Sequence, residues 1–254
     1  MAILTESEIR DLIRQPQPGM TLTVPPGTRL SPAAQDFVKH WKLELQFGAP
    51  AAEGASTGWD KPASFPVQLS GETPTCSVCG MPVSAKPEYM TQLDATRFAP
   101  KNIPRIRFRG KIDTLQSLCL LIASRARALD RPELAARLDT LAAYCREMMS
   151  AEYNERPVAP LVFADADEEA IHKATHQPEE AFGISHVVPS STDPELLHWL
   201  NVLRCESREV ELVALDAFVP APEYRVVQPS IVTAVNRFSS AVYYLELGFM
   251  AGRF

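Results

Sequence analysis

Residues 196–215, LLHWLNVLRCESREVELVAL, contain two overlapping patterns that decide the fold of this chain. Leucine and valine recur every three or four residues, so the stretch predicts a long helix with one apolar face. Four polar side chains recur at the same spacing and share another face: Asn201, Arg204, Arg208 and Glu211. Arginines on a largely apolar helix favour a buried anion site, because an unpaired buried charge costs several kcal/mol. A surface helix with a solvated charged face is the alternative.

Other stretches share this helical character, and a second polar pair, Asn236 and Arg237, lies on the last of them. The predicted helices cover residues 113–129, 133–149, 167–175, 194–217 and 229–250. Four of these helices are long, one is short, and no convincing strand lies among them. The fold is therefore predicted to be mainly α, an antiparallel five-helix bundle.

The segment before the bundle has a different character and predicts a small α+β module. Helical patterns at residues 4–13 and 31–39 alternate with strand patterns at residues 20–24 and 42–47. Residues 48–75 are rich in Ala, Gly, Ser and Pro, which is typical of a linker. We therefore predict three parts: the module at residues 1–48, a linker with a cysteine motif at 49–89, and the bundle domain at 90–254.

The charge balance of the 254-residue chain limits its partners. A net charge of −6 argues against nucleic acid as the main partner, so any anion site must be a local pocket of Arg and Lys. No apolar run approaches the roughly 20 residues of a membrane-spanning helix, and the first residues lack the layout of a signal peptide. We therefore expect a cytoplasmic protein without a membrane partner.

Five cysteines, an odd number without a secretion signal, indicate thiols or metal ligands rather than a disulfide framework. Cys76 and Cys79, followed by Gly80, have the spacing of a knuckle, in which a tight turn directs backbone amides at two thiolates. Two cysteines fill about half of a tetrahedral shell, so a Zn²⁺ or Fe²⁺ ion here needs further ligands. A second subunit or His40 could supply them; otherwise the pair is unliganded. The remaining cysteines are predicted to be small core residues: Cys119, Cys145 and Cys205.

Four motifs follow one another between residues 90 and 250: Arg97–Ser117, His186–Pro189, Arg204–Glu211 and Asn236–Ser239. In order and rough spacing they resemble the motifs of PduO-type ATP:cob(I)alamin adenosyltransferases. The ethanolamine-utilisation branch of these enzymes is more similar still. It adds an N-terminal module and further motifs, which this chain matches at Arg29–Ala34, Lys86–Thr91 and His176–Pro178. The resemblance therefore covers nearly the whole chain.

The resemblance implies an enzyme that transfers the 5′-deoxyadenosyl group of ATP to cobalt, releasing triphosphate and making adenosylcobalamin. Cob(I)alamin is itself the nucleophile, so the protein must position C5′ and stabilise a departing polyanion, for which fixed cations and Mg²⁺ are suited. The family motifs imply catalytic roles for Arg208, Glu211, Asp113 and Arg204. They imply ATP contacts at Thr91, Lys101, Arg208, Glu211, Asn236 and Arg237.

The resemblance also implies where the corrinoid binds and how subunits meet. The corrinoid site is implied at Phe182, His186, Asp113 and Arg204. In the family, the pair that matches Asp113 and Arg204 forms a salt bridge across a subunit boundary. A dimer or trimer with its active site between subunits is therefore implied, and a reductase that supplies reduced cobalt is a further candidate partner.

Several departures from the family pattern affect these expectations. His186 replaces the Phe that the family places under the corrin, and an imidazole can be a metal ligand as well as a wedge. Phe182 is the candidate substitute wedge, with core packing as its alternative role. Ser240 stands where the wider family often has Asp, and residues 92–95, QLDA, replace a Gly-Asp-x-Gly phosphate loop. Thr75 replaces the first cysteine of the ethanolamine-branch cysteine motif.

These departures leave two other functions open. The first is a non-catalytic adenosylcobalamin carrier or chaperone associated with a bacterial microcompartment, which would bind corrinoid without releasing triphosphate. Residues 4–13 could then be a peptide that binds the microcompartment shell, although they could equally pack on the small module. The second is a zinc-knuckle interaction module with a helical bundle, which leaves the polar stripe on residues 201–211 without a reason.

Overall fold

The computed structural model of the chain describes residues 3–6, 9, 13, 16–24, 27–47, 73–222 and 224–254. Two compact units make up the chain, Met1–Ser56 and Thr57–Phe254. Helices predominate among the described residues, which confirms the predicted mainly α fold class. None of the described helices is long and apolar enough to cross a membrane.

The first unit is a small α+β module, as predicted. It holds β1 (Ile3–Leu4), β2 (Thr21–Val24), β3 (Arg29–Leu30), α2 (Pro32–His40) and β4 (Glu44–Phe47), with β1 parallel to β3 and β2 parallel to β4. The Ser31 side chain caps α2 by accepting the Ala34 N–H at 3.2 Å. The predicted helix 4–13 lies partly outside the described residues, and Leu4 belongs to β1.

A three-stranded sheet, which the sequence patterns did not predict, precedes the bundle in the second unit. It consists of β5 (Thr75–Cys76), β6 (Met90–Gln92) and β7 (Arg97–Pro100) in the order β5-β7-β6. β6 and β7 are antiparallel, and Asp94 stabilises their connection by accepting the N–H groups of Thr96 and Arg97 at 2.9 and 2.8 Å. Such short strands carry too few alternating side chains to give a recognisable period.

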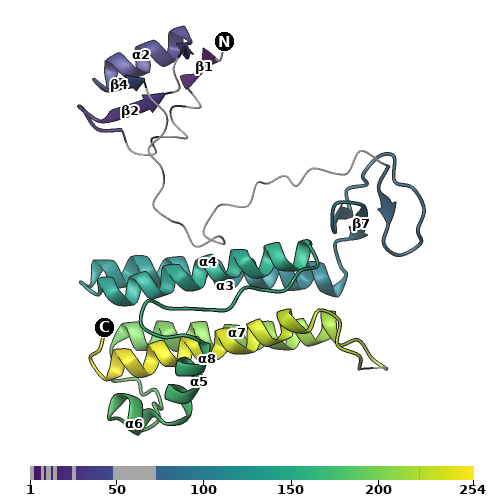
Figure 1. Ribbon diagram of the computed structural model, residues 1–254, viewed down its shortest axis with the longest axis vertical. Helices are drawn as coiled ribbons and strands as arrows, with labels where there is room; N and C mark the ends of the chain where they lie inside the picture. The colour runs from purple at the N-terminus through teal and green to yellow at the C-terminus, as the bar shows by residue number, and fades with distance from the viewer. Residues whose placement is uncertain are drawn as a thin grey trace. The chain divides into compact units, whose positions relative to one another are not determined.

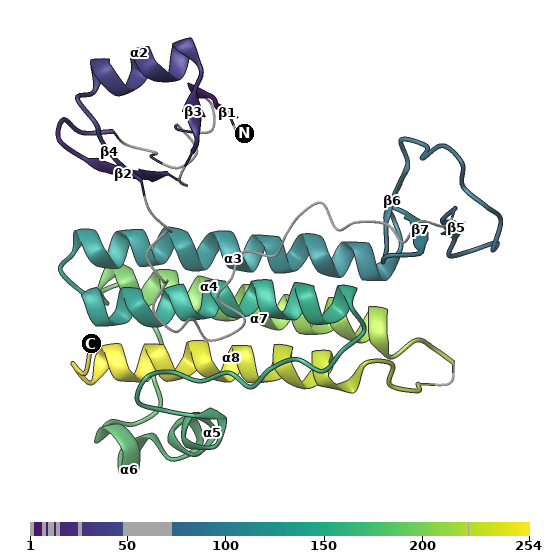
Figure 2. The ribbon, with the colours of Figure 1, turned by 45° about the horizontal axis from the view of Figure 1, so that its top comes forward.

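Four long helices lie side by side in the bundle (Figure 1, Figure 2). They are α3 (Pro104–Ala128), α4 (Pro132–Tyr153), α7 (Glu195–Phe218) and α8 (Pro229–Met250). α3 packs on α4 and α7, and α7 packs on α8. Two short helices, α5 (Glu168–His176) and α6 (Pro178–Phe182), contact α8. The bundle prediction is confirmed, and α6 is an addition to it.

Helix α3 begins at Pro104, well before the predicted start at Asp113. The prediction is wrong here because Arg105, Arg107 and Arg109 interrupt the apolar pattern, whereas proline at the first position suits a helix start. Helix α4 likewise runs past its predicted end at residue 149. These two extensions place charged residues of both helices next to each other, and they are the basis of a network described below.

The bundle core is built by the apolar faces of the long helices. Phe108 of α3 and Phe218 of α7 are almost fully buried and meet edge to face, with 5.2 Å between their ring centroids. This contact holds the N-terminal part of α3 against the C-terminal part of α7. The core therefore fixes which ends of these two helices lie together.

The cysteines within the helices are only partly as predicted. Cys119 and Cys145 are buried, whereas Cys205 is exposed. The Cys205 prediction is wrong because Leu203 and Val210 take the core-facing positions of α7, and Cys205 falls on the opposite face.

Candidate functional site

Helices α7 and α8 bring together the polar residues of two predicted motifs. The Asn236 amide on α8 donates to the Glu211 carboxylate on α7 at 2.9 Å. Further along, the Arg204 guanidinium carbon lies 4.6 Å from the centroid of the Tyr243 ring. Earlier residues of α7 thus face later residues of α8, as expected for antiparallel helices. We call the polar residues along this pair the α7–α8 seam: Arg204, Arg208, Glu211, Asn236, Tyr243 and Glu246.

Arg208 is the cation of the seam that water reaches most easily. Its side chain is exposed and has no hydrogen-bond or ion-pair partner among the residues that the structure describes. Arg204 and Glu211 are half-buried. The predicted buried anion site is therefore wrong for a single chain, because Leu203 and Val210 occupy the core face and turn the polar stripe outward. An unpaired, hydrated guanidinium is available to an anion from outside the chain.

Asp113 and Arg204, which the family resemblance pairs, form no ion pair within the described part of the chain. Asp113 is exposed on α3, although partial desolvation of its carboxyl raises its pKa. Arg204 lies on α7, which packs against α3. A pairing of these residues between two copies of the chain stays a prediction.

The three-stranded sheet carries two of the predicted ATP-binding residues. Thr91, half-buried in β6, pairs with Ala99 of β7. Lys101 directly follows β7, and its backbone N–H donates to the Tyr89 carbonyl at 2.9 Å while its side chain is exposed. The β6–β7 pair therefore carries Thr91, and Lys101 directly follows it.

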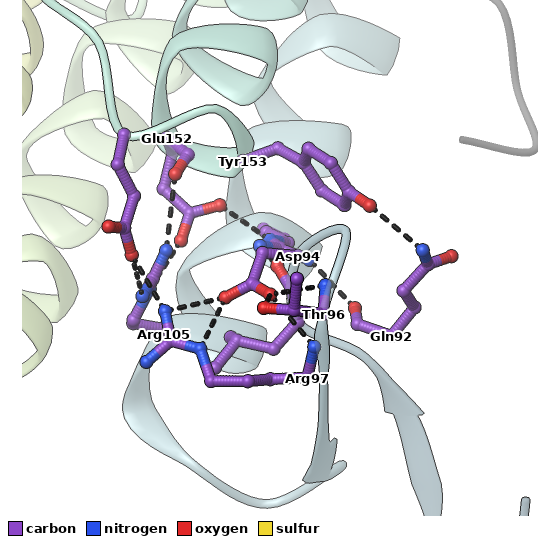
Figure 3. A network of polar contacts seen from close by, with 10 residues as sticks. Gln92, Asp94, Thr96, Arg97, Arg105, Glu152 and Tyr153 are labelled. Carbon is purple, nitrogen blue, oxygen red and sulfur yellow. Dashed lines mark hydrogen bonds and ion pairs between the residues drawn. The ribbon is translucent and has the colours of Figure 1, made fainter. Parts of the chain in front are cut away.

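A network of ion pairs docks this sheet on α3 and α4 (Figure 3). At its centre, the fully buried Glu152 carboxylate accepts from Arg105 Nε and Arg109 Nε, both at 2.6 Å. Arg109 also donates to the backbone carbonyls of Gln92 and Leu93, which belong to the sheet and its connection. We call the charged residues involved the Glu152 network: Asp94, Arg97, Arg105, Arg109, Glu152 and Glu155.

The outer part of the Glu152 network joins the β6–β7 connection to the end of α4. Arg97 donates to Asp94 at 2.6 Å and to Glu155 at 2.9 Å, and Glu155 also accepts from Arg105 at 3.1 Å. Burial of Asp94 opposes its ionisation, but hydrogen bonds from Thr96 and Arg97 outweigh this and lower the pKa of Asp94. Since the arginines of the network already bind carboxylates, they serve the structure rather than a ligand.

The loop from Ser185 to Pro189, which the resemblance places under the corrin, is attached to α8 by Tyr243. The Tyr243 hydroxyl lies 2.9 Å from His186 Nδ1 and accepts the Val187 N–H at 3.3 Å. The His186 and Tyr243 rings are almost parallel, with 6° between their planes and 6.1 Å between their centroids. His186 is exposed. The sequence analysis missed Tyr243, and its spacing from Asn236, two helical turns away on the same side of α8, was the available signal.

Two other predicted site residues lie away from the seam. Phe182 ends α6 and packs edge-on against Tyr244, with 5.2 Å between centroids, which agrees with its core-packing alternative. Arg237 faces α5, where its guanidinium donates to His172 Nδ1 at 3.1 Å. The structure therefore brings Arg237 to the α5 histidine and Asn236 to α7, because neighbouring residues of a helix point about 100° apart.

The segment Cys76–Gly80 forms the tight turn expected of a knuckle. The Gly80 N–H donates to the Cys76 carbonyl at 2.8 Å, and Gly80 has a left-handed φ of 70°. Backbone N–H groups of Cys79 and Val78 donate to the Cys76 sulfur and lower the pKa of this thiol. Among the described residues, no group of three or more His, Cys, Asp or Glu side chains could hold a metal ion. Within this part of the chain, a metal ion at the turn would find only the two thiols of Cys76 and Cys79.

Known proteins resemble the chain over most of its length. The family model for cobalamin adenosyltransferase matches residues 83–247. Corrinoid adenosyltransferase EutT of Salmonella typhimurium strain LT2 is 27% identical over 237 residues, which cover 90% of this chain and 85% of the relative. Corrinoid adenosyltransferase EutT of Escherichia coli strain K12 is 27% identical over 236 residues, with the same coverage. No solved structure matches the chain significantly.

Proposed function

Because the chain belongs to the cobalamin adenosyltransferase family, we propose that it transfers the 5′-deoxyadenosyl group of ATP to a reduced corrinoid. In this reaction a cobalt–carbon bond forms at C5′, the C5′–oxygen bond breaks, and triphosphate leaves with the electron pair of that bond. The observation that carries the proposal is the convergence of Arg204, Arg208 and Glu211 on α7 with Asn236 on α8. No nucleophile from the protein is needed, so cations and a positioned carboxylate are sufficient.

Arg208 is proposed to bind the departing triphosphate. Its guanidinium is exposed and has no partner in the described part of the chain, so it can form bidentate hydrogen bonds to phosphate oxygens. Thr91 of β6 and Lys101, which directly follows β7, are proposed to contact the same polyphosphate. Arg237 stays outside this proposal because its guanidinium faces His172.

Glu211 is proposed to bind Mg²⁺ together with triphosphate oxygens. The Asn236 amide holds one carboxylate oxygen of Glu211, and the side chain is half-buried, so its orientation is restrained. One carboxylate and substrate phosphates are a ligand set that Mg²⁺ commonly takes, and the ion would neutralise charge on the leaving group.

The corrinoid is proposed to bind at the loop that carries His186, with Asp113 and Arg204 completing the site between two copies of the chain. The exposure of Asp113 and the half-exposed position of Arg204 support a contact with a second chain. Analytical ultracentrifugation of the wild type and of Asp113→Ala tests this assembly. We expect a dimer or trimer that weakens in the variant, and a monomeric wild type would contradict the shared site.

A direct assay tests the activity. Purified protein is mixed with MgATP and chemically reduced cobalamin, and the visible spectrum is followed while released triphosphate is measured. We expect adenosylcobalamin and triphosphate in equal amounts. If the protein binds cobalamin tightly but releases no triphosphate, the transfer proposal fails and the carrier function, favoured by His186 in place of the family Phe, takes its place.

For the knuckle we propose a Zn²⁺ or Fe²⁺ ion shared by Cys76 and Cys79 of two copies. The hydrogen bonds to the Cys76 sulfur favour its thiolate, the form that binds metals. Elemental analysis should find roughly one ion for two chains, in line with four sulfur ligands per ion. Cys79→Ala should lose this metal, whereas Cys205→Ala, an exposed cysteine outside the turn, should retain it. Equal metal content in both variants would contradict the assignment.

A further inference from the structure

Tyr243 joins two segments that are far apart in the chain, the loop from Ser185 to Pro189 and helix α7. Its hydroxyl contacts His186 Nδ1 at 2.9 Å and the Val187 N–H at 3.3 Å. The Arg204 guanidinium lies over its ring at 4.6 Å. Both His186 and Arg204 are candidate corrinoid-binding residues, and the Tyr243 side chain contacts both.

The hydrogen bonds of the Tyr243 hydroxyl restrict the loop. The Val187 N–H can only donate, so one lone pair of the hydroxyl is committed to the backbone. The hydroxyl can also donate its hydrogen to His186 Nδ1, or accept a hydrogen from it, depending on the imidazole tautomer. In either case this contact restrains the orientation of the imidazole ring. His186 Nε2 is the ring nitrogen left without this restraint, on an exposed side chain.

The ring of Tyr243, as distinct from its hydroxyl, contacts a cation. Arg204 contacts the ring by a cation–π interaction, which fixes the guanidinium relative to α8. Desolvation raises the pKa of Tyr243, so the phenol stays protonated and keeps its donor hydrogen at neutral pH. The ring and the hydroxyl therefore act on different partners at once, and the two functions can be separated by removing the hydroxyl alone.

We propose that Tyr243 is a positioning residue for corrinoid binding: its hydroxyl holds the His186 imidazole and the loop backbone against α8, while its ring holds Arg204. This inference rests on the proposed corrinoid site. Tyr243 itself need not touch the substrate. Loss of the hydroxyl leaves His186 free to rotate, so the corrinoid must order the loop on binding, and affinity falls.

The test uses Tyr243→Phe, which keeps the ring for Arg204 and removes the hydroxyl. We expect the KM for corrinoid to rise about tenfold while the KM for ATP changes less than about twofold, as expected for one lost positioning contact. His186→Ala, a change at an exposed side chain that folding tolerates, should have an effect of similar size. The matched control is Tyr244→Phe, which removes a hydroxyl from the adjacent residue, where the ring packs on Phe163 and Phe182. Its KM for corrinoid should stay within about twofold.

A double-variant cycle separates positioning from general stability. If Tyr243 acts in part through His186, the affinity loss in the variant with both Tyr243→Phe and His186→Ala should be clearly smaller than the two single losses combined. The electron paramagnetic resonance spectrum of bound cob(II)alamin should differ between the wild type and Tyr243→Phe, because the residue facing the corrin has moved. Additive effects, identical spectra, or a parallel rise in the KM for ATP would overturn the proposal.

Binding measurements without turnover keep the two proposals distinct. Titration of each variant with cob(II)alamin, followed by the visible spectrum, needs no adenosyl transfer. If the wild type binds cob(II)alamin without transferring the adenosyl group, and Tyr243→Phe weakens that binding, the positioning role stands and the proposed reaction fails. If the wild type turns over and Tyr243→Phe has unchanged affinity, the positioning role alone fails.

Discussion

The Glu152 network and the α7–α8 seam both place charges on packed helices, but they treat those charges in opposite ways. In the network, Glu152 is 0% exposed and lies between Arg105 and Arg109, which are 18% and 14% exposed. In the seam, Arg208 is exposed without a partner in the described chain. Charges that already bind each other hold a structure together, whereas charges left unpaired are available to a ligand. The comparison therefore separates the docking of the small sheet from the candidate site.

Glu246 belongs to the seam and, like Glu152, is a buried carboxylate, but it differs from Glu152 in its partners. It is 0% exposed, and neither carboxylate oxygen has a hydrogen-bond partner among the described residues. Burial raises the pKa of Glu246 to about 7, and the charge of Arg204 acts in the opposite direction. The Glu152 carboxylate has two arginine donors, whereas the Glu246 carboxylate has none among the described residues. Ionisation of Glu246 therefore lowers the stability of the folded chain.

The largest expected effect is that of Glu152→Ala, which would break the network at its centre. Arg105 and Arg109 would lose their shared carboxylate, and the free energy of unfolding should fall by about 3 kcal/mol. Urea unfolding followed by circular dichroism measures this. The matched control is Glu155→Ala in the same network, because Glu155 is 50% exposed and should contribute about 1 kcal/mol or less. If both variants lost the same free energy of unfolding, burial of the carboxylate would not decide how much an ion pair of the network contributes to stability.

An effect of similar size, with a distinct pH dependence, is expected for Glu246→Gln. Between its usual value near 4.5 and about 7, the unfolded chain releases this proton before the folded chain does. Stability therefore falls as the pH rises through this range, and the total loss is on the order of 3 kcal/mol, because each unit of difference in pKa corresponds to about 1.4 kcal/mol. Glu246→Gln should remove that loss. The free energy of unfolding of the variant should therefore rise relative to that of the wild type between pH 4.5 and pH 7.5. Parallel stability curves for the two proteins would show that Glu246 is not ionising in a buried site.

The smallest effect in free energy is the one that tests the seam as a ligand site. Arg208→Ala should slow adenosyl transfer at least about tenfold, equivalent to about 1.4 kcal/mol of transition-state stabilisation. Its unfolding free energy should stay within about 0.5 kcal/mol of the wild type, because the side chain is exposed and unpaired in the described chain. Arg131→Ala, an exposed arginine at the start of α4, is the control and should leave both quantities unchanged. If Arg208→Ala lost stability but transferred the adenosyl group normally, Arg208 would serve the structure, like the arginines of the Glu152 network, and not a ligand.

The two regions also differ in how far they could be predicted. Helices α7 and α8 were predicted, together with Arg204, Arg208, Glu211 and Asn236 of the seam, because helical spacing is a local property of the sequence. The Glu152 network was not, since it joins Arg105 to Glu152 across 47 positions of sequence and depends on where α3 starts and α4 ends. Tyr243 was missed for a similar reason: its spacing from Asn236 shows which side of α8 it lies on, but not that the loop with His186, 57 positions away, contacts it.

The sequence by itself determined that four long helices form, roughly where they lie, and to which family the motifs are similar. Only the tertiary structure decided that Arg105 is bound to a carboxylate while Arg208 is left exposed, and that Asn236 and Arg237 face different helices. The physical reason is that periodicity is set by residues a few positions apart, whereas the partner of a charge is set by how distant helices pack and by the antiparallel register between them.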